Sequence, residues 1–508
     1  MLISLADFSN HNKDVFLVSI DKMIDRGALM SRYSRSSELD IREVYKHEFK
    51  DNPNRGRNFY RRIFSEYGDE SIAELVTAQV GIQNISNIAS KYIEENRIGL
   101  SYLEKSSRYV EYDAKKNGEY LYLKGESLGF SGSISERYEE YCDTLFQTYS
   151  DYREKVYLHL EKMFPFEKFS EEYPPEESDA LLKKAYTRAL KSRVLDEIRS
   201  LLPSSTLTNL GVSGNGRAFH HLIIKLYNSE LPELQRIGEE LFLELKKELP
   251  ELIDDVNSQH SVSLANYLKE RDRETCATLT SYDGHLVSLR NYLPEREALA
   301  RVYEARNFLL DCNKVQAAHE RDDGSFVLRD SFIRNNRRDK PGRWYEFVPY
   351  TFIINTNYGA FRELQRHRML SIVRRKLTPL YGYDIPPIIR SIPELRERFT
   401  SIMDRALSIW KMIKNTNGES VAQYTVPFGY RYPVILHANL RELCYFVELR
   451  STPQAHYDLR MIAQDIYGSI KRVHPTLSKI IKFVDLHDYP LGRMRSEIKK
   501  ERKRRMSE

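Results

Sequence analysis

The chain alternates between short runs of β-branched and aromatic residues and longer runs in which apolar positions recur with a helical period. Residues 346–356 are rich in valine, isoleucine, threonine and aromatic side chains, which predicts a strand, and residues 74–84 predict another. Each strand is followed by a predicted helix, over residues 358–370 and residues 85–99. This mixture of strands and helices predicts an α+β fold.

The order of these elements repeats along the chain. In each half a proline comes 12 positions before an Asn-x-Arg sequence, as Pro203 before Asn215 and Pro427 before Asn439. A repeated set of strand, helix, proline and Asn-x-Arg predicts two related domains in tandem. Such domains would pair with each other as a covalent pseudo-dimer.

The repeat also sets the expected boundaries. We place the first domain at residues 1–260 and the second at residues 275–490, with the junction in the charged stretch 245–273. The interval from Ser101 to Asn215 in the first half is 46 residues longer than the corresponding interval from Ser371 to Asn439 in the second half. Helical periodicity assigns this excess to an insertion at about residues 127–190. Residues 491–508 form a basic tail.

Composition narrows the class of protein. The 508 residues are 30% charged and contain no run of 18 apolar residues, so we expect a cytoplasmic protein with no membrane span. Four cysteines without CxxC spacing predict neither a disulfide framework nor a metal site. Most of the net charge of +5 lies in the tail, which we interpret as a frayed, solvated helix end. Contact of the tail with nucleic acid is the alternative.

Arginines supply the candidate chemistry. The most distinctive run is Arg366-His367-Arg368, at the end of a predicted helix. Guanidinium groups bind phosphates and planar acceptors through paired N–H donors. No glycine-rich phosphate loop is present, so side chains would have to hold an anionic ligand. The further candidates come from both halves: Arg108, Arg199, Arg362, Arg441 and Arg450.

Two stretches together resemble the signature of the flavin-dependent thymidylate synthases, in which Arg-His-Arg and a serine precede Asn-Glu-x-Ser-x-Arg-Tyr. Residues 366–371 read RHRMLS, and residues 101–109 read SYLEKSSRY. Each half has lost a different part of the motif. The first keeps Ser101, Glu104, Ser106, Arg108 and Tyr109, and the second keeps Arg366, His367, Arg368 and Ser371.

The resemblance implies one composite site per chain. It assigns substrate dUMP to Glu104, Ser106, Arg108, Arg199, Arg366 and Arg450, with Arg366 and Arg450 also catalytic. It assigns the cofactor FAD to Arg366, His367, Arg368, Asn439 and Arg441. Methylenetetrahydrofolate and NADPH would be co-substrates in the methylation of dUMP to dTMP, and the chain would pair as a homodimer equivalent to the family's tetramer.

Departures from the family leave alternatives open. Glu363 replaces a glutamine three positions before the Arg-His-Arg run, and a carboxylate there would repel a phosphate. A catalytically silent flavin- or nucleotide-binding protein is one alternative. A nucleic-acid-binding protein that uses the arginines and the basic tail is the other.

Overall fold

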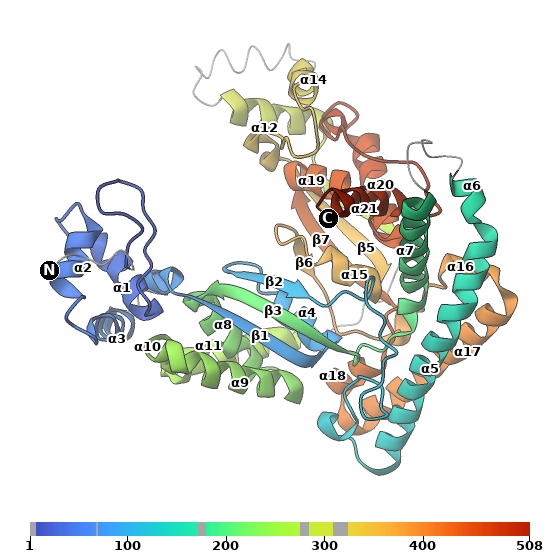
Figure 1. The fold of residues 1–508 in the computed structure, drawn as a ribbon, viewed down its shortest axis with the longest axis horizontal. Helices are drawn as coiled ribbons and strands as arrows, with labels where there is room; N and C mark the ends of the chain where they lie inside the picture. The colour runs from blue at the N-terminus through green and yellow to red at the C-terminus, as the bar shows by residue number, and fades with distance from the viewer. Residues whose placement is uncertain (1–6, 68–69, 171–178, 275–283, 308–323, 508) are drawn as a thin grey trace. The chain divides into compact units, whose positions relative to one another are not determined.

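The computed structural model describes residues 7–67, 70–170, 179–274, 284–307 and 324–507. The chain forms two compact units, each made of two segments (Figure 1). Unit 1 contains Met1–Lys105 and Leu207–Ala277, and unit 2 contains Ser106–Thr206 and Thr278–Glu508. Within the described ranges, no helix combines the length and the apolar content that a membrane span requires.

Unit 1 is built on an antiparallel sheet of three strands in the order β1-β3-β2. These are β1 (Thr77–Ser86), β2 (Leu100–Glu104) and β3 (Leu207–Asn215). Strand β1 bulges between Ile82 and Ile85, where Asn84 has φ 55°, a left-handed conformation that asparagine tolerates better than most residues. Beyond the bulge, Ile85 and Ser86 are both buried.

Helices enclose the apolar side of this sheet, where α8 contacts β3 and packs against α9 (Figure 1). The helix α8 is amphipathic and buries Phe219, Leu222 and Ile223. The helices of unit 1 are α1 (Met23–Tyr33), α2 (Ile41–Glu48), α3 (Arg55–Tyr67), α4 (Asn87–Glu94), α8 (Gly216–Tyr227), α9 (Pro232–Glu248), α10 (Pro250–Ile253) and α11 (Gln259–Glu274), with 3-10 turns η1 (Glu70–Leu75) and η4 (Asp254–Asn257).

Unit 2 is built on an antiparallel sheet of four strands in the order β4-β5-β7-β6. These are β4 (Val287–Tyr292), β5 (Pro349–Asn357), β6 (Ser371–Val373) and β7 (Arg431–Asn439). Alternate residues of β5 and β7 are fully buried because one face of the sheet is covered by α19 (Leu440–Arg450) and α20 (Tyr457–Val473) (Figure 1). The buried side chains include Phe352, Ile354 and Leu436.

The remaining helices of unit 2 pack around this core. The long helix α5 (Gly132–Met163) contacts both α7 (Asp179–Ile198) and α17 (Pro393–Asn417). The others are α6 (Phe166–Ser170), α12 (Glu295–Asn307), α14 (Ser325–Phe332), α15 (Tyr358–Leu364), α16 (Pro387–Ser391), α18 (Glu419–Ala422) and α21 (Met494–Ser507), with 3-10 turns η2 (Glu126–Leu128), η3 (Arg199–Leu201), η5 (Arg343–Phe347), η6 (Pro379–Tyr381), η7 (Gln423–Thr425) and η8 (Leu477–Ile480).

The predicted duplication is visible in the sheets. Each half has a strand, a helix, a short strand, and then a central strand that leads into a second helix: β1-α4-β2-β3-α8 and β5-α15-β6-β7-α19. The central strand pairs with both others in each case. Asn215 and Asn439 cap the second helices, and each side-chain oxygen accepts a backbone N–H at 2.9 Å. The repeated Asn-x-Arg therefore marks a helix start.

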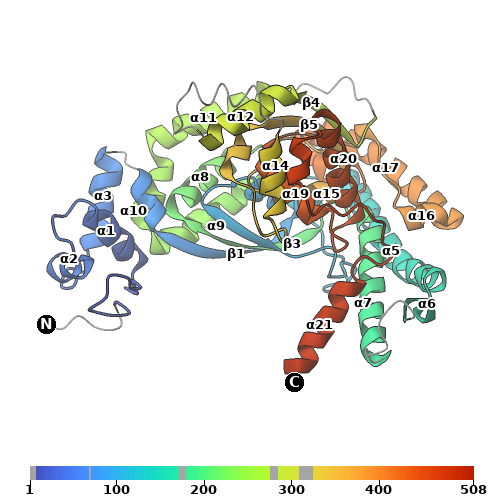
Figure 2. The same ribbon diagram turned by 90° about the horizontal axis from the view of Figure 1, so that it is seen from above.

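Two expectations need correction. The helix predicted over residues 358–370 ends at Leu364, because the chain turns there and the N–H of His367 bonds the Leu364 carbonyl. The basic tail is solvated only at its end. Residues 494–507 form α21, which packs against α7 (Figure 2) and buries Met494 and Ile498, whereas residues 502–506 are exposed.

The compact units cut across the sequence halves. Residues 106–206, which include the 127–190 region, pack with the second half of the chain. The first-half residues Arg108 and Arg199 thus lie in unit 2 together with the Arg-His-Arg run, whereas Glu104 lies in unit 1. Most of the candidate site residues can therefore be described within one unit.

Candidate functional site

A basic pocket of about 310 Å³ lies in unit 2 where the Arg-His-Arg run meets α19. Two acids, Glu442 and Glu448, also line it. An excess of guanidinium and ammonium groups in a concave site favours a ligand with phosphate or another anionic group. The lining cations are Arg334, Arg337, Lys340, Arg366, Arg368, Arg441 and Arg450.

Because α15 ends at Leu364, the Arg366-His367-Arg368 run that follows it is not helical, and this determines which of its side chains face the pocket. Past Leu364 the chain turns, and side chains alternate in direction, so His367 is buried while Arg366 and Arg368 are exposed. The ring of His367 packs edge-on against Phe446 of α19, with ring centroids 4.8 Å apart. This contact fixes the turn, and the two flanking arginines border the pocket.

His367 orients Arg450, which the family resemblance assigns to dUMP and to catalysis. The Nε of Arg450 donates to Nε2 of His367 at 2.7 Å, which requires the imidazole to accept at that nitrogen. Burial lowers the pKa of His367, and the nearby Arg450 lowers it further, so the ring is neutral near pH 7. Burial also lowers the pKa of Arg450. The pair is a rigid, positively charged donor at the wall of the pocket.

Other cations of the pocket are held by the fold. Arg334 forms a buried ion pair with Glu448 at 2.6 Å. Arg441 donates to the Pro341 carbonyl at 2.8 Å and to Glu346 at 3.0 Å. These contacts shape the wall, and Arg441, whose side chain is 31% exposed, remains accessible to a ligand whereas Arg334 is buried.

Below the pocket, arginines from both halves converge on Glu363. Arg199 donates to its carboxylate at 2.8 Å, Arg108 at 3.2 Å, and Arg450 approaches to 3.9 Å. Glu363 is buried, as are Arg108 and Arg199. Three arginines that the sequence assigns to the nucleotide therefore share one carboxylate from their own chain.

Electrostatics keep this cluster fully ionised. Burial alone would raise the pKa of Glu363, but Arg108 and Arg199 hold it well below its usual range. Asp196 adds a second carboxylate and accepts from Arg108 at 2.7 and 2.9 Å. Its pKa is also lowered, because Arg108 outweighs the effect of burial. The cluster thus contains two buried carboxylates opposite the arginines.

Several assigned residues lie outside the pocket. Glu104, in unit 1, is buried and pairs with Lys91 at 2.9 Å. The Ser106 hydroxyl accepts the Arg108 backbone N–H at 3.2 Å. Asn439 caps α19 and does not line the pocket. The assignment of these three residues to substrate or cofactor stays a prediction.

Two ionic partners in this site were missed by sequence reasoning. Asp196 lies three positions before Arg199, a helical spacing that could have marked a shared face. The Arg334–Glu448 pair joins residues 114 positions apart, and no local pattern links them. In the part of the chain that the structure describes, no group of three metal-ligating side chains comes together.

Comparison with known families identifies the family to which the chain belongs. The chain belongs to the family described as thymidylate synthase complementing protein, whose model matches residues 20–251 and again residues 289–476. The double match agrees with the repeated strand order of the two sheets. The resemblance carried by the Arg-His-Arg and SYLEKSSRY segments is thereby confirmed at the level of the family.

Relatives of full length carry a name without a function. A UPF0159 protein of Thermoplasma acidophilum is 49% identical, covering 94% of this chain and 99% of the relative. A UPF0159 protein of Chlamydia muridarum is 34% identical, covering 98% and 99%. A flavin-dependent thymidylate synthase of Sulfolobus acidocaldarius is 30% identical over 149 residues, 27% of this chain and 56% of that enzyme.

Proposed function

We propose that this protein is a flavin-dependent thymidylate synthase with one composite site per chain. It would methylate dUMP to dTMP with methylenetetrahydrofolate as the one-carbon donor and NADPH as the reductant. The observation that carries the proposal is the convergence of first-half Arg108 and Arg199 with second-half Glu363 and Arg450 in one unit. Each half of the chain has lost a different part of the motif, and we infer that the parts retained by the two halves lie together because they still form a shared site.

The basic pocket suits the proposed cofactor. Its donor set is mostly guanidinium, which matches the diphosphate of FAD, and Arg366, Arg368 and Arg441 would hold that group. When bound, the reduced flavin supplies the hydride that converts the transferred one-carbon unit to a methyl group. His367 would act indirectly, as the neutral acceptor that holds Arg450 in place.

Arg450 has the electrostatic role in this proposal. C5 of the uracil becomes nucleophilic toward the one-carbon unit when the ring carries enolate-like negative charge, and a fixed, partly buried cation would stabilise that charge. The side chain of Arg450 is 18% exposed, so it can reach a ligand in the pocket without leaving its His367 contact. Arg366 lines the same pocket and would add a second donor toward the nucleotide.

A second candidate is favoured by Glu363. The carboxylate already neutralises the arginines that would otherwise bind the nucleotide phosphate. In this alternative the protein binds flavin or a nucleotide without forming dTMP. The homologous halves would serve as a binding scaffold and the chain would lack turnover.

The visible spectrum of the purified protein tests the first candidate, followed by titration of any flavin band with dUMP. We expect a flavin spectrum that shifts saturably with dUMP. The Arg450→Ala variant should lose the shift, whereas Arg396→Ala, an exposed arginine of α17, should keep it. A chain that neither copurifies with flavin nor binds it on reconstitution contradicts the first candidate and leaves only nucleotide binding for the second.

The proposal extends to assembly. We expect a homodimer in which the two tandem domains of each chain form a pseudo-dimer, so that the pair mimics a tetramer. Light scattering after gel filtration should give twice the 59.8 kDa of one chain. A monomer at micromolar concentration would contradict this arrangement.

A further inference from the structure

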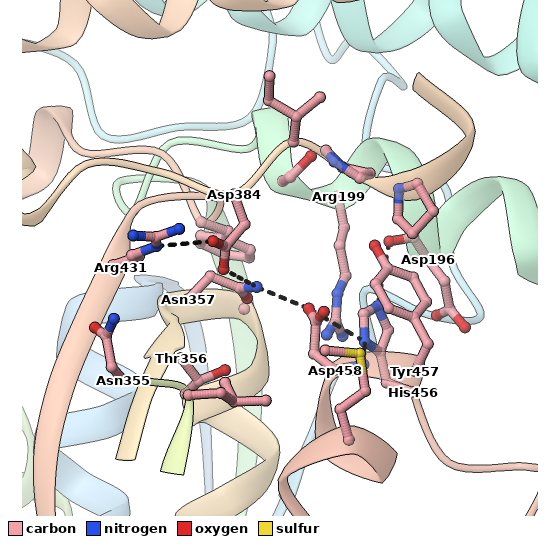
Figure 3. Close-up of a pocket in the computed structure, with 18 of the residues that line it drawn as sticks. Asp196, Arg199, Asn355, Thr356, Asn357, Asp384, Arg431, His456, Tyr457 and Asp458 are labelled. Atoms are coloured by element: carbon pink, nitrogen blue, oxygen red, sulfur yellow. Dashed lines mark hydrogen bonds and ion pairs between the residues drawn. The ribbon is translucent and has the colours of Figure 1, made fainter. Parts of the chain in front are cut away.

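A second pocket, of about 270 Å³, lies in unit 2 and is lined by Arg199 (Figure 3). The end of β5, the start of α20 and the segment around Asp384 form its walls. Only Arg199 among its lining residues was singled out by the sequence. The pocket is separate from the basic pocket beside the Arg-His-Arg run, with which it shares no lining residue.

A row of carboxylate, amide and carboxylate crosses this pocket (Figure 3). The Nδ2 of Asn357 donates to Asp458 at 2.7 Å and to Asp384 at 3.3 Å, and Arg431 donates to Asp384 at 2.8 Å. The Asn357 oxygen accepts the Ala360 N–H as the cap of α15, which fixes the amide orientation. Asn357 and His456 both contact Oδ2 of Asp458, at 2.7 and 3.5 Å, and Asp458 itself lines the pocket.

Two buried polar atoms of the pocket lack partners among the described residues. Arg199 is 3% exposed, and its Nη1 bonds Glu363 while its Nη2 has no hydrogen bond. The hydroxyl of Thr356, 1% exposed, also has none. Leaving a buried donor unsatisfied costs about 1–3 kcal/mol, so such atoms next to a cavity point to a ligand that completes them.

The arrangement selects the chemistry of that ligand. An anion would face Asp458, and a cation would face Arg199, so a neutral molecule fits best. It needs an acceptor for the Arg199 N–H beside a donor for the Asp458 carboxylate. Phe428, Tyr457 and two consecutive prolines also line the pocket, and ring side chains of this kind suit a planar ligand.

We propose that this pocket binds a planar heterocycle through a lactam edge, its carbonyl accepting from Arg199 and its adjacent N–H donating to Asp458. Uracil-type pyrimidines, hypoxanthine-type purines and pterins all present this edge. Binding depends on the pocket alone and would occur whether or not the chain forms dTMP. Since Arg199 also bonds Glu363, an occupant would contact the arginine cluster from its far side.

Calorimetric titration of the full chain with uracil, hypoxanthine and 6-methylpterin tests the proposal, and 1,3-dimethyluracil, which has no N–H, is the blank. We expect saturable binding of at least one of the three probes and none of the blank. The probe that binds most tightly identifies the source of the ring. Equal binding of uracil and 1,3-dimethyluracil would overturn the proposal, as would failure of all three probes, which would mean that water satisfies the two atoms.

Variants locate the binding. Asp458→Ala should weaken it at least tenfold, and Asp465→Ala, an exposed acid on the same helix, should not. Met461→Trp should fill the pocket and abolish binding even if Asp458→Ala fails to fold. Arg450→Ala should leave it unchanged, because Arg450 lines the basic pocket and not this one. Loss of binding in Arg450→Ala with retention in Met461→Trp would place the ring in the basic pocket and refute the assignment.

Discussion

Replacing Glu363 by glutamine is the most informative perturbation of the arginine cluster. The change keeps the shape of the side chain and removes the carboxylate charge that Arg199 and Arg108 contact at 2.8 and 3.2 Å. Removing one partner from a buried ion pair destabilises a protein by about 3–5 kcal/mol, because the remaining charge is left uncompensated. Asp196 still pairs with Arg108, so we expect a loss near the lower end, about 3 kcal/mol.

The same change should create an anion site. Arg199 loses its carboxylate partner, Arg108 keeps only Asp196, and a hydrogen bond from a charged donor contributes roughly 1.5–3 kcal/mol. Part of that gain is offset by desolvation of the anion, so we expect dUMP to bind at least tenfold more tightly, a change of about 1.4 kcal/mol. At phosphate concentrations about 100 times the dissociation constant, the variant should regain about 2.7 kcal/mol of stability.

Urea unfolding with and without phosphate measures both effects, and Glu397→Gln, an exposed residue of α17, is the matched control. Wild type and control should respond little to phosphate, whereas Glu363→Gln should be unstable without it and partly restored with it. If Glu363→Gln unfolds at the wild-type urea concentration and ignores phosphate, the arginines do not depend on Glu363. The reasoning about the cluster would then be refuted.

Three further predictions concern the basic pocket. Arg450→Ala should lower kcat/KM for dTMP formation by about a hundredfold, as loss of one charge-stabilising donor does elsewhere, and Arg396→Ala should not. The pKa of His367 is lower in the folded chain than in the unfolded chain, so the unfolded chain binds a proton at this histidine more readily. The free energy of unfolding should therefore fall as the pH drops below 6.5. Urea unfolding of His367→Gln should show a smaller decrease in the free energy of unfolding over the same pH range. Arg334→Met should lose about 3–5 kcal/mol by leaving Glu448 alone, and combining it with Glu448→Leu should recover most of that loss in the same urea assay.

Local signals made much of the fold predictable. The strands at residues 74–84 and 346–356 were placed to within a few residues because β-branched and aromatic runs are strong strand signals. The Asn215 and Asn439 landmarks proved to be helix caps, a role that depends only on neighbouring residues. The end of α15 was predicted too late, because nothing in Arg366-His367-Arg368 disfavours a helix and packing of His367 on Phe446 decides the turn.

Residues of the candidate site could be predicted from the sequence only where they belong to the family motif. Arg108, Arg199 and Arg450 could be selected by family resemblance, but their meeting at Glu363 depends on contacts between residues up to 255 positions apart. The sequence suggested that Glu363 would repel a phosphate, and the structure adds that it occupies the arginines itself. The second pocket has no motif, because Asn357, Asp384 and Asp458 come from three separate elements.

Release of tritium from C5 of labelled dUMP reports directly on methyl transfer to the pyrimidine ring. The full chain would be supplied with FAD, NADPH and methylenetetrahydrofolate, and dTMP would be measured in the same reaction. We predict saturable tritium release matched by dTMP, lost in Arg450→Ala and retained in Arg396→Ala. Bound flavin without tritium release would contradict the synthase assignment and leave the chain as a flavin- or nucleotide-binding protein.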